Sequence, residues 1–387
     1  MKKGWQTKKL GDVCEVIAGQ SPEGKFYNAE AKGMPFYQGK KDFGDKFIEA
    51  PTTWTTQTTK IAKEGDILMS VRAPVGPVNF ATDEVCIGRG LAAIRSSDEL
   101  NRDFLFYQLW HLQPEIAGRE GAVFASINKA EIEALPLAYA PLAEQQRIVG
   151  LLDEAFEGLA TAKANAEKNL QNARALFESH LQSVFTQRGP GWVVKHLKEV
   201  CEKITDGTHQ TPKYFDQGIV FLSSRNVTSG TIDWNRIKYI DTKQHLEMHK
   251  RVAPRRNDIL LAKNGTTGVA AIVDRDTTFD IYVSLALLRA LPVMRPRFLL
   301  HFINSPAAKV QFNKRLKGVG VPNLHLEEIR EVRLAFPADL KAQDRVADEL
   351  DDLREETQRL ARLYEQKHAA LEALKKSLLH QAFSGEL

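Results

Sequence analysis

The chain has 387 residues, 26% of them charged and 43% hydrophobic, and a formal net charge of +4 at pH 7. The composition is that of an ordinary globular protein, and the length exceeds what one compact core usually supports, so two or three domains are expected. The sequence has no run of about 18 apolar residues, and no apolar stretch follows its charged N-terminal residues. We therefore expect a cytoplasmic protein without a membrane span, whose mild basicity is compatible with nucleic-acid binding.

The elements predicted in the first half of the chain return in the second half. Each half is expected to hold two apolar strands bounded by turn residues, followed by a helix with apolar residues at helical spacing. The segments are residues 66–71, 90–94 and 104–109 in the first half, and 258–263, 283–288 and 296–303 in the second. Each half is therefore predicted to be a mixed α/β unit.

The two halves also share residues at corresponding places. Gly4-Trp5 returns as Gly191-Trp192, at an offset of 187 residues (191 − 4), and Gln145 returns as Gln343, at an offset of 198 (343 − 145). A chain built from two long copies of one unit is expected to fold with a pseudo-two-fold axis.

Two long helices are predicted, over residues 144–186 and 341–384, because neither segment contains proline and the second contains no glycine. Apolar residues recur every seven positions in both, which favours a coiled coil. The predicted seam consists of Ile148, Leu152, Leu159 and Leu176 in the first helix, and of Val346, Leu350, Leu353, Leu360, Leu371, Leu374 and Leu378 in the second. The alternative is two separate amphipathic helices, each lying on its own domain.

The order of the segments sets the direction of the helices. The first leads into the second globular unit and the second leads out of it, so we expect them to pack antiparallel, as a rod of roughly 65 Å. Five apolar residues outside the seam are expected to remain uncovered until a partner binds. They are Leu151, Phe156, Phe177, Leu181 and Phe185.

The sequence lacks the common motifs of catalysis. Cys14, Cys86 and Cys201 form no CxxC pair, which argues against a zinc site or a disulfide framework, and the ten histidines are not expected to cluster at ligand spacing. No phosphate-binding GxxxxGK[ST] loop, HExxH or GxSxG occurs. We therefore expect no catalytic residue, no metal and no cofactor in this chain, and an enzyme with two pseudo-symmetric sites is disfavoured.

Polar and basic loops follow the strands in both halves, with different residues at matching places. Gln, Asn, Arg, Lys and Ser side chains pair with base edges, and Gly and Thr let backbone amides approach phosphates. The candidate DNA-binding residues are Gln38, Lys40, Lys41, Arg72 and Arg89 in the first half, and Thr208, His209, Ser223, Ser224, Arg225, Asn226, Lys263, Asn264 and Thr266 in the second. The alternative is that these loops are solvated turns with ordinary surface charge.

Several segments, taken with the duplicated layout, carry a family resemblance. They are residues 70–76 (SVRAPVG), 141–149 (PLAEQQRIV), 206–212 (DGTHQTP) and 383–387 (FSGEL). With them, essentially the whole chain resembles the specificity subunit of a type I restriction–modification system. The entry to the second long helix, residues 337–345, is a degenerate copy of the first.

The resemblance implies an α+β fold with two pseudo-symmetric target-recognition domains separated by a long antiparallel coiled coil of two helices. The expected boundaries are 1–143 and 187–340 for the domains, 144–186 for the first long helix, and 341–387 for the second with its tail. Each domain would read one half of an asymmetric bipartite site in double-stranded DNA, and the helices would fix the unread spacer.

The same resemblance implies two kinds of protein partner. Two methyltransferase subunits, which carry S-adenosylmethionine, would bind the helices, and restriction subunits, which use ATP and Mg²⁺, would join them. The rival interpretation is a coiled-coil scaffold that binds proteins and has no DNA specificity.

Overall fold

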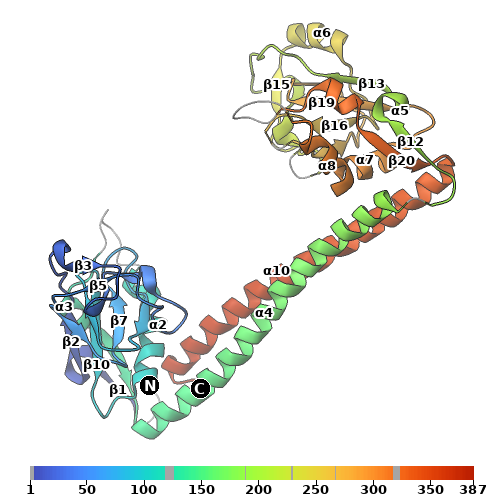
Figure 1. The fold of residues 1–387 in the computed structure, drawn as a ribbon. Helices are drawn as coiled ribbons and strands as arrows, with labels where there is room; N and C mark the ends of the chain where they lie inside the picture. Colours follow the sequence, from blue (N-terminus) through green and yellow to red (C-terminus); the bar gives the residue numbers. More distant parts are fainter. Residues whose placement is uncertain (1–3, 118–125, 188, 228–229, 266, 317–322) are drawn as a thin grey trace. The chain divides into compact units, whose positions relative to one another are not determined.

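The structure is a computed structural model, and it describes residues 4–117, 126–187, 189–227, 230–265, 267–316 and 323–387 (Figure 1). The chain divides into two compact units: residues 1–166 with 366–387, and residues 167–365. The long helices α4 (Leu142–Thr186) and α10 (Leu340–Ser384) contribute to both units. None of the described helices is both long and apolar enough to cross a membrane.

The first unit is built on two sheets. One has four strands in the order β2-β10-β7-β8, the other has five in the order β3-β5-β4-β9-β6, and β1 pairs with β11. The strands are β1 (Gln6–Lys9), β2 (Cys14–Ala18), β3 (Tyr27–Asn28), β4 (Met34–Tyr37), β5 (Trp54–Thr55), β6 (Ile61–Ala62), β7 (Ile67–Ser70), β8 (Val78–Phe80), β9 (Val85–Ile87), β10 (Leu91–Ser96) and β11 (Pro136–Tyr139). The helices are α1 (Leu10–Val13), α2 (Arg102–Ala117) and α3 (Lys129–Glu133), with 3₁₀ turns η1 (Gly24–Phe26) and η2 (Lys40–Asp42).

The second unit repeats this plan. Its four-stranded sheet has the order β13-β19-β16-β17, a three-stranded sheet has the order β15-β14-β18, and β12 pairs with β20. The strands are β12 (Trp192–His196), β13 (Cys201–Asp206), β14 (Ile219–Leu222), β15 (Lys238–Ile240), β16 (Ile259–Ala262), β17 (Ala270–Ile272), β18 (Phe279–Ile281), β19 (Leu285–Ala290) and β20 (Arg333–Pro337). The helices are α5 (Leu197–Val200), α6 (Thr242–Arg251), α7 (Pro296–Asn304), α8 (Pro306–Asn313) and α9 (Leu326–Arg330), with the 3₁₀ turn η3 (Ser224–Asn226).

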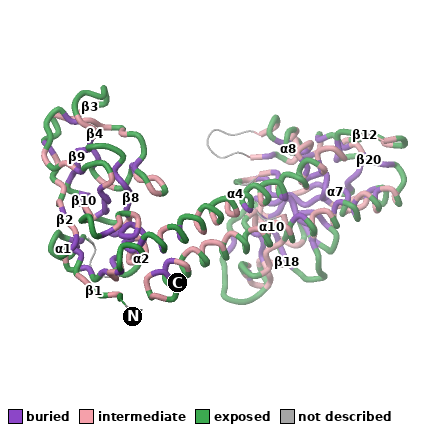
Figure 2. Tube along the Cα trace, turned by 90° about the horizontal axis from the view of Figure 1, so that it is seen from below, coloured by how far each residue is buried: buried purple, intermediate pink, exposed green. Residues whose placement is uncertain are grey.

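The central strands separate two apolar cores in each unit. Successive side chains of a strand point to opposite faces. Ile67 and Met69 of β7 therefore enter the core that contains α2, while Leu68 enters the core shared with the other sheet. Ile259 and Leu260 of β16 divide in the same way. Both faces are covered, which explains why these strands are continuous apolar runs and why the strands are the most buried part of each unit (Figure 2).

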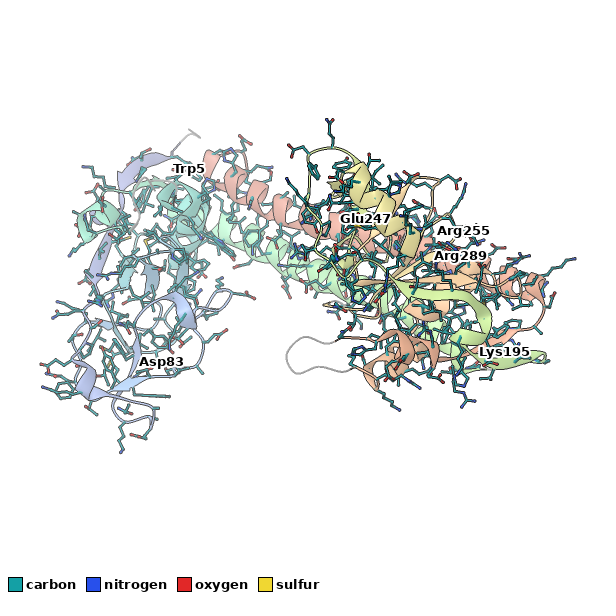
Figure 3. All side chains as sticks on the ribbon, turned by 90° about the horizontal axis from the view of Figure 1, so that it is seen from above. Trp5, Asp83, Lys195, Glu247, Arg255 and Arg289 are labelled. Carbon is teal, nitrogen blue, oxygen red and sulfur yellow. The ribbon has the colours of Figure 1, made fainter. Side chains whose placement is uncertain are left out.

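Matching polar contacts hold the two frameworks. Arg95 pairs with the buried Asp66 at 2.8 Å, and Arg289, labelled in Figure 3, pairs with the buried Asp258 at 2.7 Å. These pairs join neighbouring antiparallel strands at the same place in each sheet. The same strand order of the four-stranded sheets and the same buried ion pair confirm the predicted duplication and the α+β class.

The long helices pack antiparallel within each unit. In the first unit, Lys163 contacts Glu372 at 2.8 Å, and Arg147 near the start of α4 donates to the backbone oxygen of Leu387. In the second, Arg174 contacts Glu365 at 2.8 Å. The coiled-coil prediction is confirmed, and the alternative of two separate helices is not what the structure shows.

The predicted seam is covered at most of its positions and is wrong at Leu176 and Leu374. The row through Leu152 and Leu350 is buried, and Leu159, Leu371 and Leu378 in that row are half-buried. In the other row, Leu176 and Leu374 are 53% and 47% exposed. Ile148 of that row is buried, and Val346, Leu353 and Leu360 are half-buried. The positions one residue further on are covered as well, and these include Lys163, Phe177, Arg354, His368, Lys375 and Ala382. Several of these covered positions hold polar residues, so the spacing of apolar residues alone did not indicate them.

The apolar residues outside the seam are mostly covered by the globular parts. Leu181 and Phe185 are buried, and Phe185 packs edge-on against Phe298 of α7. Phe156 packs against Tyr107 of α2. Of the five residues expected to await a partner, Leu151 is the one that stays strongly exposed, at 43%.

Candidate nucleic-acid interface

Three loops of the first unit meet at Gly90. Its backbone N–H donates to the Gln38 carbonyl at 3.2 Å, and its own carbonyl accepts from the Val71 N–H at 3.0 Å. A Cβ at Gly90 would lie 2.4 Å from the Gln38 oxygen, so only glycine allows this approach. The loops that carry Gln38, Arg72 and Arg89 are therefore held together at one place.

These loops present cations that the unit itself does not neutralise. Lys40, Arg72 and Arg89 are exposed, and within the described parts of the chain their side chains have no hydrogen-bonding or ion-pair partner. Lys41 differs, because its ammonium donates to Thr52 and lies 3.8 Å from the Asp42 carboxylate. Three exposed cations on adjoining loops suit contacts to phosphates or to guanine edges.

In the second unit the corresponding strands lead into a groove. β14 and β18 pair in parallel, as β4 and β9 do in the first unit, and the residues that follow them line the groove. The lining side chains are Thr211, Tyr214, Phe221, Ser223, Ser224, Arg225, Asn226, Asp233, Arg236, Lys238, Tyr282 and Ser284. The predicted residues Ser223, Ser224, Arg225 and Asn226 are thus brought together there.

Asn226 has a structural role in this groove. It is 5% exposed, and its Oδ1 accepts from the Ser223 N–H at 2.9 Å. Its Nδ2 donates to the backbone oxygens of Asp233 and Arg236. Because both ends of the amide are used inside the protein, the prediction that Asn226 reads a base is corrected, while Arg225 beside it is exposed.

The Lys263 ammonium is also used internally. Lys263 is 5% exposed and lies 3.2 Å from Asp206, which also accepts from Arg251 and His209. Burial alone would raise the pKa of Asp206, but the hydrogen bonds from Arg251, Lys263 and His209 hold that pKa below its usual value. The prediction that Lys263 neutralises DNA phosphates is corrected, because a buried charge already paired cannot meet a phosphate without breaking that pair.

The remaining candidates border a second hollow beside this cluster, which is lined by Asp206, His209, Lys263, Asn264, Val283, Asn323, His325, Leu326, Glu327 and Arg330. Thr208 lies next to it, and its hydroxyl accepts from the Gln210 N–H in a local turn. The side-chain oxygens of Asn264 and Asn323 are buried there without a hydrogen-bond partner among the described residues. Thr266 lies outside the described residues.

Sequence reasoning missed part of the groove. Tyr214 is 39% exposed, and the Lys238 ammonium lies 3.8 Å from the centre of its ring. Tyr282 contacts Thr211 at 3.4 Å through its hydroxyl, and Arg236 completes the lining. Tyr214 and Lys238 are 24 positions apart (238 − 214), and the antiparallel bridge between their neighbours Phe215 and Tyr239 brings them together. A signal in the sequence could have indicated this part of the groove, because the aromatic Tyr214 precedes β14 and the basic Arg236 and Lys238 follow it.

A polar cluster on α6 corrects another prediction. His245 and His249 stand four residues apart on this helix, and their Nδ1 atoms lie 2.7 and 3.1 Å from the two oxygens of Asp280 on β18. The statement that histidines do not cluster at ligand spacing was wrong, because residues four apart share one face of a helix.

Comparison with known proteins identifies the family. The model of the type I restriction modification DNA specificity domain matches residues 2–170 and again residues 190–367. The chain is 39% identical over 174 residues to the putative type I restriction enzyme MjaX specificity subunit of Methanocaldococcus jannaschii, a match that covers 44% of this chain and 40% of that protein. The MjaIX specificity subunit of the same organism is 24% identical, over 59% of each chain. The matches thus span about half the length of these relatives.

Two solved structures share the whole fold. One comes from work on complex assembly and conformational transition of the type I R-M system, with a TM-score of 0.83, 19% identity, and coverage of 100% of this chain and 99% of that one. The HsdS subunit from Thermoanaerobacter tengcongensis has a TM-score of 0.65 and 18% identity, with coverage of 100% and 98%.

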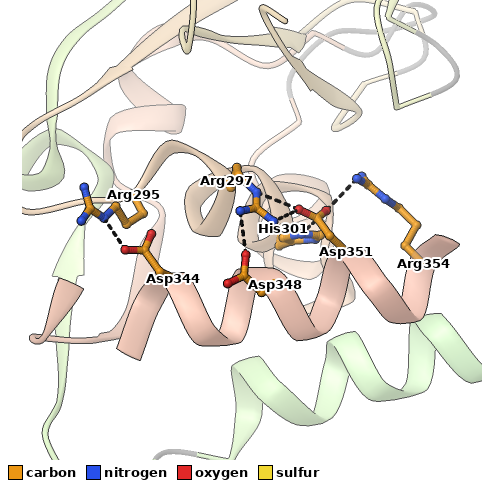
Figure 4. Close-up of polar contacts among 7 residues, drawn as sticks. All are labelled: Arg295, Arg297, His301, Asp344, Asp348, Asp351 and Arg354. Atoms are coloured by element: carbon orange, nitrogen blue, oxygen red, sulfur yellow. Dashed lines mark hydrogen bonds and ion pairs between the residues drawn. The ribbon is translucent and has the colours of Figure 1, made fainter. Parts of the chain in front are cut away.

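Ion pairs also fix α10 against α7 in the second unit. Figure 4 shows these contacts, in which Arg297 pairs with Asp348 and Asp351.

Proposed function

Because the chain belongs to the family of type I restriction-modification DNA specificity domains, we propose that it is a non-catalytic specificity subunit that reads an asymmetric bipartite DNA site. Each unit would read one half of that site. The observation that carries this proposal is the combination of a repeated framework with unlike loops. The four-stranded sheets have the same strand order in both units, but the loops expose different side chains.

The unlike loops suit two different half-sites. The first unit offers the exposed cations Lys40, Arg72 and Arg89 around a glycine-lined junction. The second offers Arg225 beside the exposed ring of Tyr214. Arginine pairs bidentately with guanine, and the major groove gives each base pair its own donor and acceptor pattern. Two dissimilar sets of side chains on one framework would therefore select two dissimilar sequences.

Catalysis would reside on partners in this proposal. Two methyltransferase subunits carrying S-adenosylmethionine would bind the long helices, and restriction subunits using ATP and Mg²⁺ would join them. Support comes from Leu176 and Leu374, which are exposed and occupy equivalent positions of the two helices, 198 residues apart (374 − 176). Equivalent apolar positions, one in each unit, fit two copies of one partner.

Methylation mapping of a host with and without this gene tests the proposal. Co-expression with its methyltransferase should produce one asymmetric motif interrupted by an unread spacer. Replacing residues 191–337 with the matching segment of a relative should change one half of that motif and leave the other half intact. A chain that binds methyltransferase but leaves methylation without sequence preference would instead be a protein-interaction scaffold.

A further inference from the structure

Helix α6 is attached to the second unit by polar contacts. None of its ten residues is buried, and Leu246 on it is 59% exposed. Figure 3 labels Glu247 on this helix. Most helices in proteins are stabilised by burying an apolar face, and a helix of this length has little stability alone. The attachment of α6 must therefore come mainly from its hydrogen bonds and charges.

The central attachment consists of His245, His249 and Asp280. The carboxylate of Asp280 has a side-chain exposure of 1%, and each of its oxygens faces one imidazole Nδ1, at 2.7 Å from His245 and 3.1 Å from His249. The ligand atoms of all three residues lie within 4.8 Å of one another. The side chain of His249 is 32% exposed, so the cluster is accessible from solvent on one side.

Comparison of the two units shows that Asp280 is not required by the sheet. Asp280 lies opposite Phe221 in the parallel pair of β14 and β18. In the first unit, Cys86 lies opposite Phe36 in the parallel pair of β4 and β9, and it is fully buried. The same framework position therefore accepts a small apolar side chain, and a buried carboxylate there is costly unless a cation compensates it.

The helix itself is also specific to the second unit. β16 begins 192 residues after β7 (259 − 67), so residues 50–59 of the first unit correspond to α6. These residues form the short strand β5 and bends, and no helix. The carboxylate and the two histidines are thus found together in one unit, and both are lacking at the matching places in the other.

We propose that His245, His249 and Asp280 form a binding site for a divalent transition metal of the zinc class, which fastens α6 to β18. Two imidazoles and one carboxylate are a ligand set that zinc accepts, with a water in the fourth position. Bonds of about 2.0–2.2 Å at a tetrahedral angle separate two donors by about 3.3–3.6 Å. The separation of His249 from Asp280, 3.1 Å, is close to this range, and that of His245 from Asp280, 2.7 Å, would have to open by roughly 0.6–0.9 Å. Each neutral imidazole would carry its proton on Nε2, which leaves the Nδ1 lone pair for the metal.

A metal at this site would also steady the loop that precedes the groove. The side chain of Gln244 on α6 accepts from the Lys213 N–H at 2.8 Å and donates to the Lys213 carbonyl at 3.0 Å. At the end of the helix, Arg251 bonds Asp206. Fixing α6 therefore holds residues 206–213 at two points. The metal proposal rests on the cluster alone and does not depend on DNA recognition.

The test uses the full chain without a histidine tag, co-purified with its methyltransferase partner if needed and stripped with EDTA. Zinc content after dialysis against zinc and then buffer should be one ion per chain for the wild type. The affinity, measured by competition with a chromogenic chelator, should fall at least about 100-fold in His249→Gln, since even loss of an outer-shell partner costs 10–100-fold. Co²⁺ should give a visible d–d spectrum that His249→Gln loses.

Two controls separate the site from general histidine binding and from misfolding. His380 lies close to His111, with ring centres 5.7 Å apart, so His380→Asn removes one histidine of a second pair and should leave zinc affinity unchanged. Hydrogen exchange should show that zinc protects residues 242–251 in the wild type and that His249→Gln keeps wild-type exchange in the rest of the unit. Zinc binding that is absent from the wild type, or that is equal in His249→Gln, overturns the proposal.

Discussion

At the scale of single residues, the direction of a side chain decides between recognition and support. The amide of Asn226 bonds three backbone groups and is almost completely buried, whereas Arg89 has no partner among the described residues and extends from a loop. Both were predicted from the same evidence, a polar residue in a turn. Sequence shows which loops are polar, but the contacts across the fold determine which side chains remain available.

Replacing Asn226 with alanine should therefore affect stability more than specificity. The Ser223 N–H and two carbonyls would lose their partner in a buried place, at a cost of about 1–3 kcal/mol. Denaturant unfolding of the full chain should show this loss, and the methylated motif should keep both halves. A stable variant with a changed motif would return Asn226 to the set of base-reading residues.

Replacing Arg89 with alanine should have the opposite effect. The side chain is exposed, so the melting temperature should stay within a degree or so of wild type. If Arg89 contacts a base edge, the variant should bind the cognate DNA more weakly by about 1–3 kcal/mol. It should lose discrimination between bases only in the half-site read by the first unit. The matched control is Arg225→Ala, whose effect should be confined to the other half. Binding competition with half-site variants measures both, and a loss shared by all sequences would indicate phosphate contact.

At the scale of elements, two glutamines fix the long helices to their units. The Gln145 side chain accepts from the Asn101 N–H at 2.7 Å and donates to the Ala140 and Glu99 carbonyls. Gln343 does the same with the Arg295 N–H at 2.8 Å and the Pro337 and Val293 carbonyls. Each glutamine has no exposed surface and ties the start of a long helix to the start of the helix that packs on it.

Changing Gln145 to glutamate should loosen α4 from the first unit. Glutamate keeps the shape of the glutamine side chain but places an oxygen where Nε2 now donates to two carbonyls. Two buried hydrogen bonds are then lost, and the new oxygen repels both carbonyl oxygens. We expect a loss of about 1–3 kcal/mol or more in unfolding free energy. Hydrogen exchange should rise around residues 99–101 and 140–148 and not around Gln343. Unchanged exchange at both places would show that the amide is dispensable.

The pH dependence of α10 docking should follow Asp351. Burial alone would raise its pKa, but hydrogen bonds from His301 and Arg297 hold the pKa far below its usual value (Figure 4). A pKa lowered in the folded state adds stability above the unfolded value of about 3.9 and loses it as the pH falls toward the folded value. Asp351→Asn should therefore cost about 1.5–3 kcal/mol at pH 7, and this cost should be only partly reduced at pH 3, since the carboxylate of the folded protein is still ionised there. Equal costs at the two pH values would contradict this.

The seam of the helices marks the limit of what periodicity predicts. Helix positions and the antiparallel direction followed from the missing prolines and from chain order, and Leu152 and Leu350 were placed correctly. Leu374 in the second row was placed wrongly, because the next residue, Lys375, is the half-covered one, with its ammonium over the rings of Trp110 and Phe156. A long charged side chain can cover apolar surface with its methylenes, so a polar letter does not exclude a covered position.

At the scale of the whole molecule, the repeat makes a prediction about the number of partners. Leu176 and Leu374 occupy equivalent positions, are 53% and 47% exposed, and belong to different units. If they are contacts for two methyltransferase subunits, each single change should remove one copy. Leu176→Glu and Leu374→Glu should each leave one methyltransferase per chain in native mass spectrometry, and the double variant should bind none. Glutamate is a good helix former and both sites are exposed, so the helices should persist.

The control for this experiment is an exposed apolar residue elsewhere. Val310 on α8 is 54% exposed and lies outside the long helices, so Val310→Glu should keep two methyltransferases per chain. The two single variants also separate a symmetric assembly from a cooperative one. Independent sites give one bound copy at wild-type affinity, whereas coupled sites weaken the remaining copy too. If the double variant still binds two methyltransferases, Leu176 and Leu374 are not part of the surface that binds this partner.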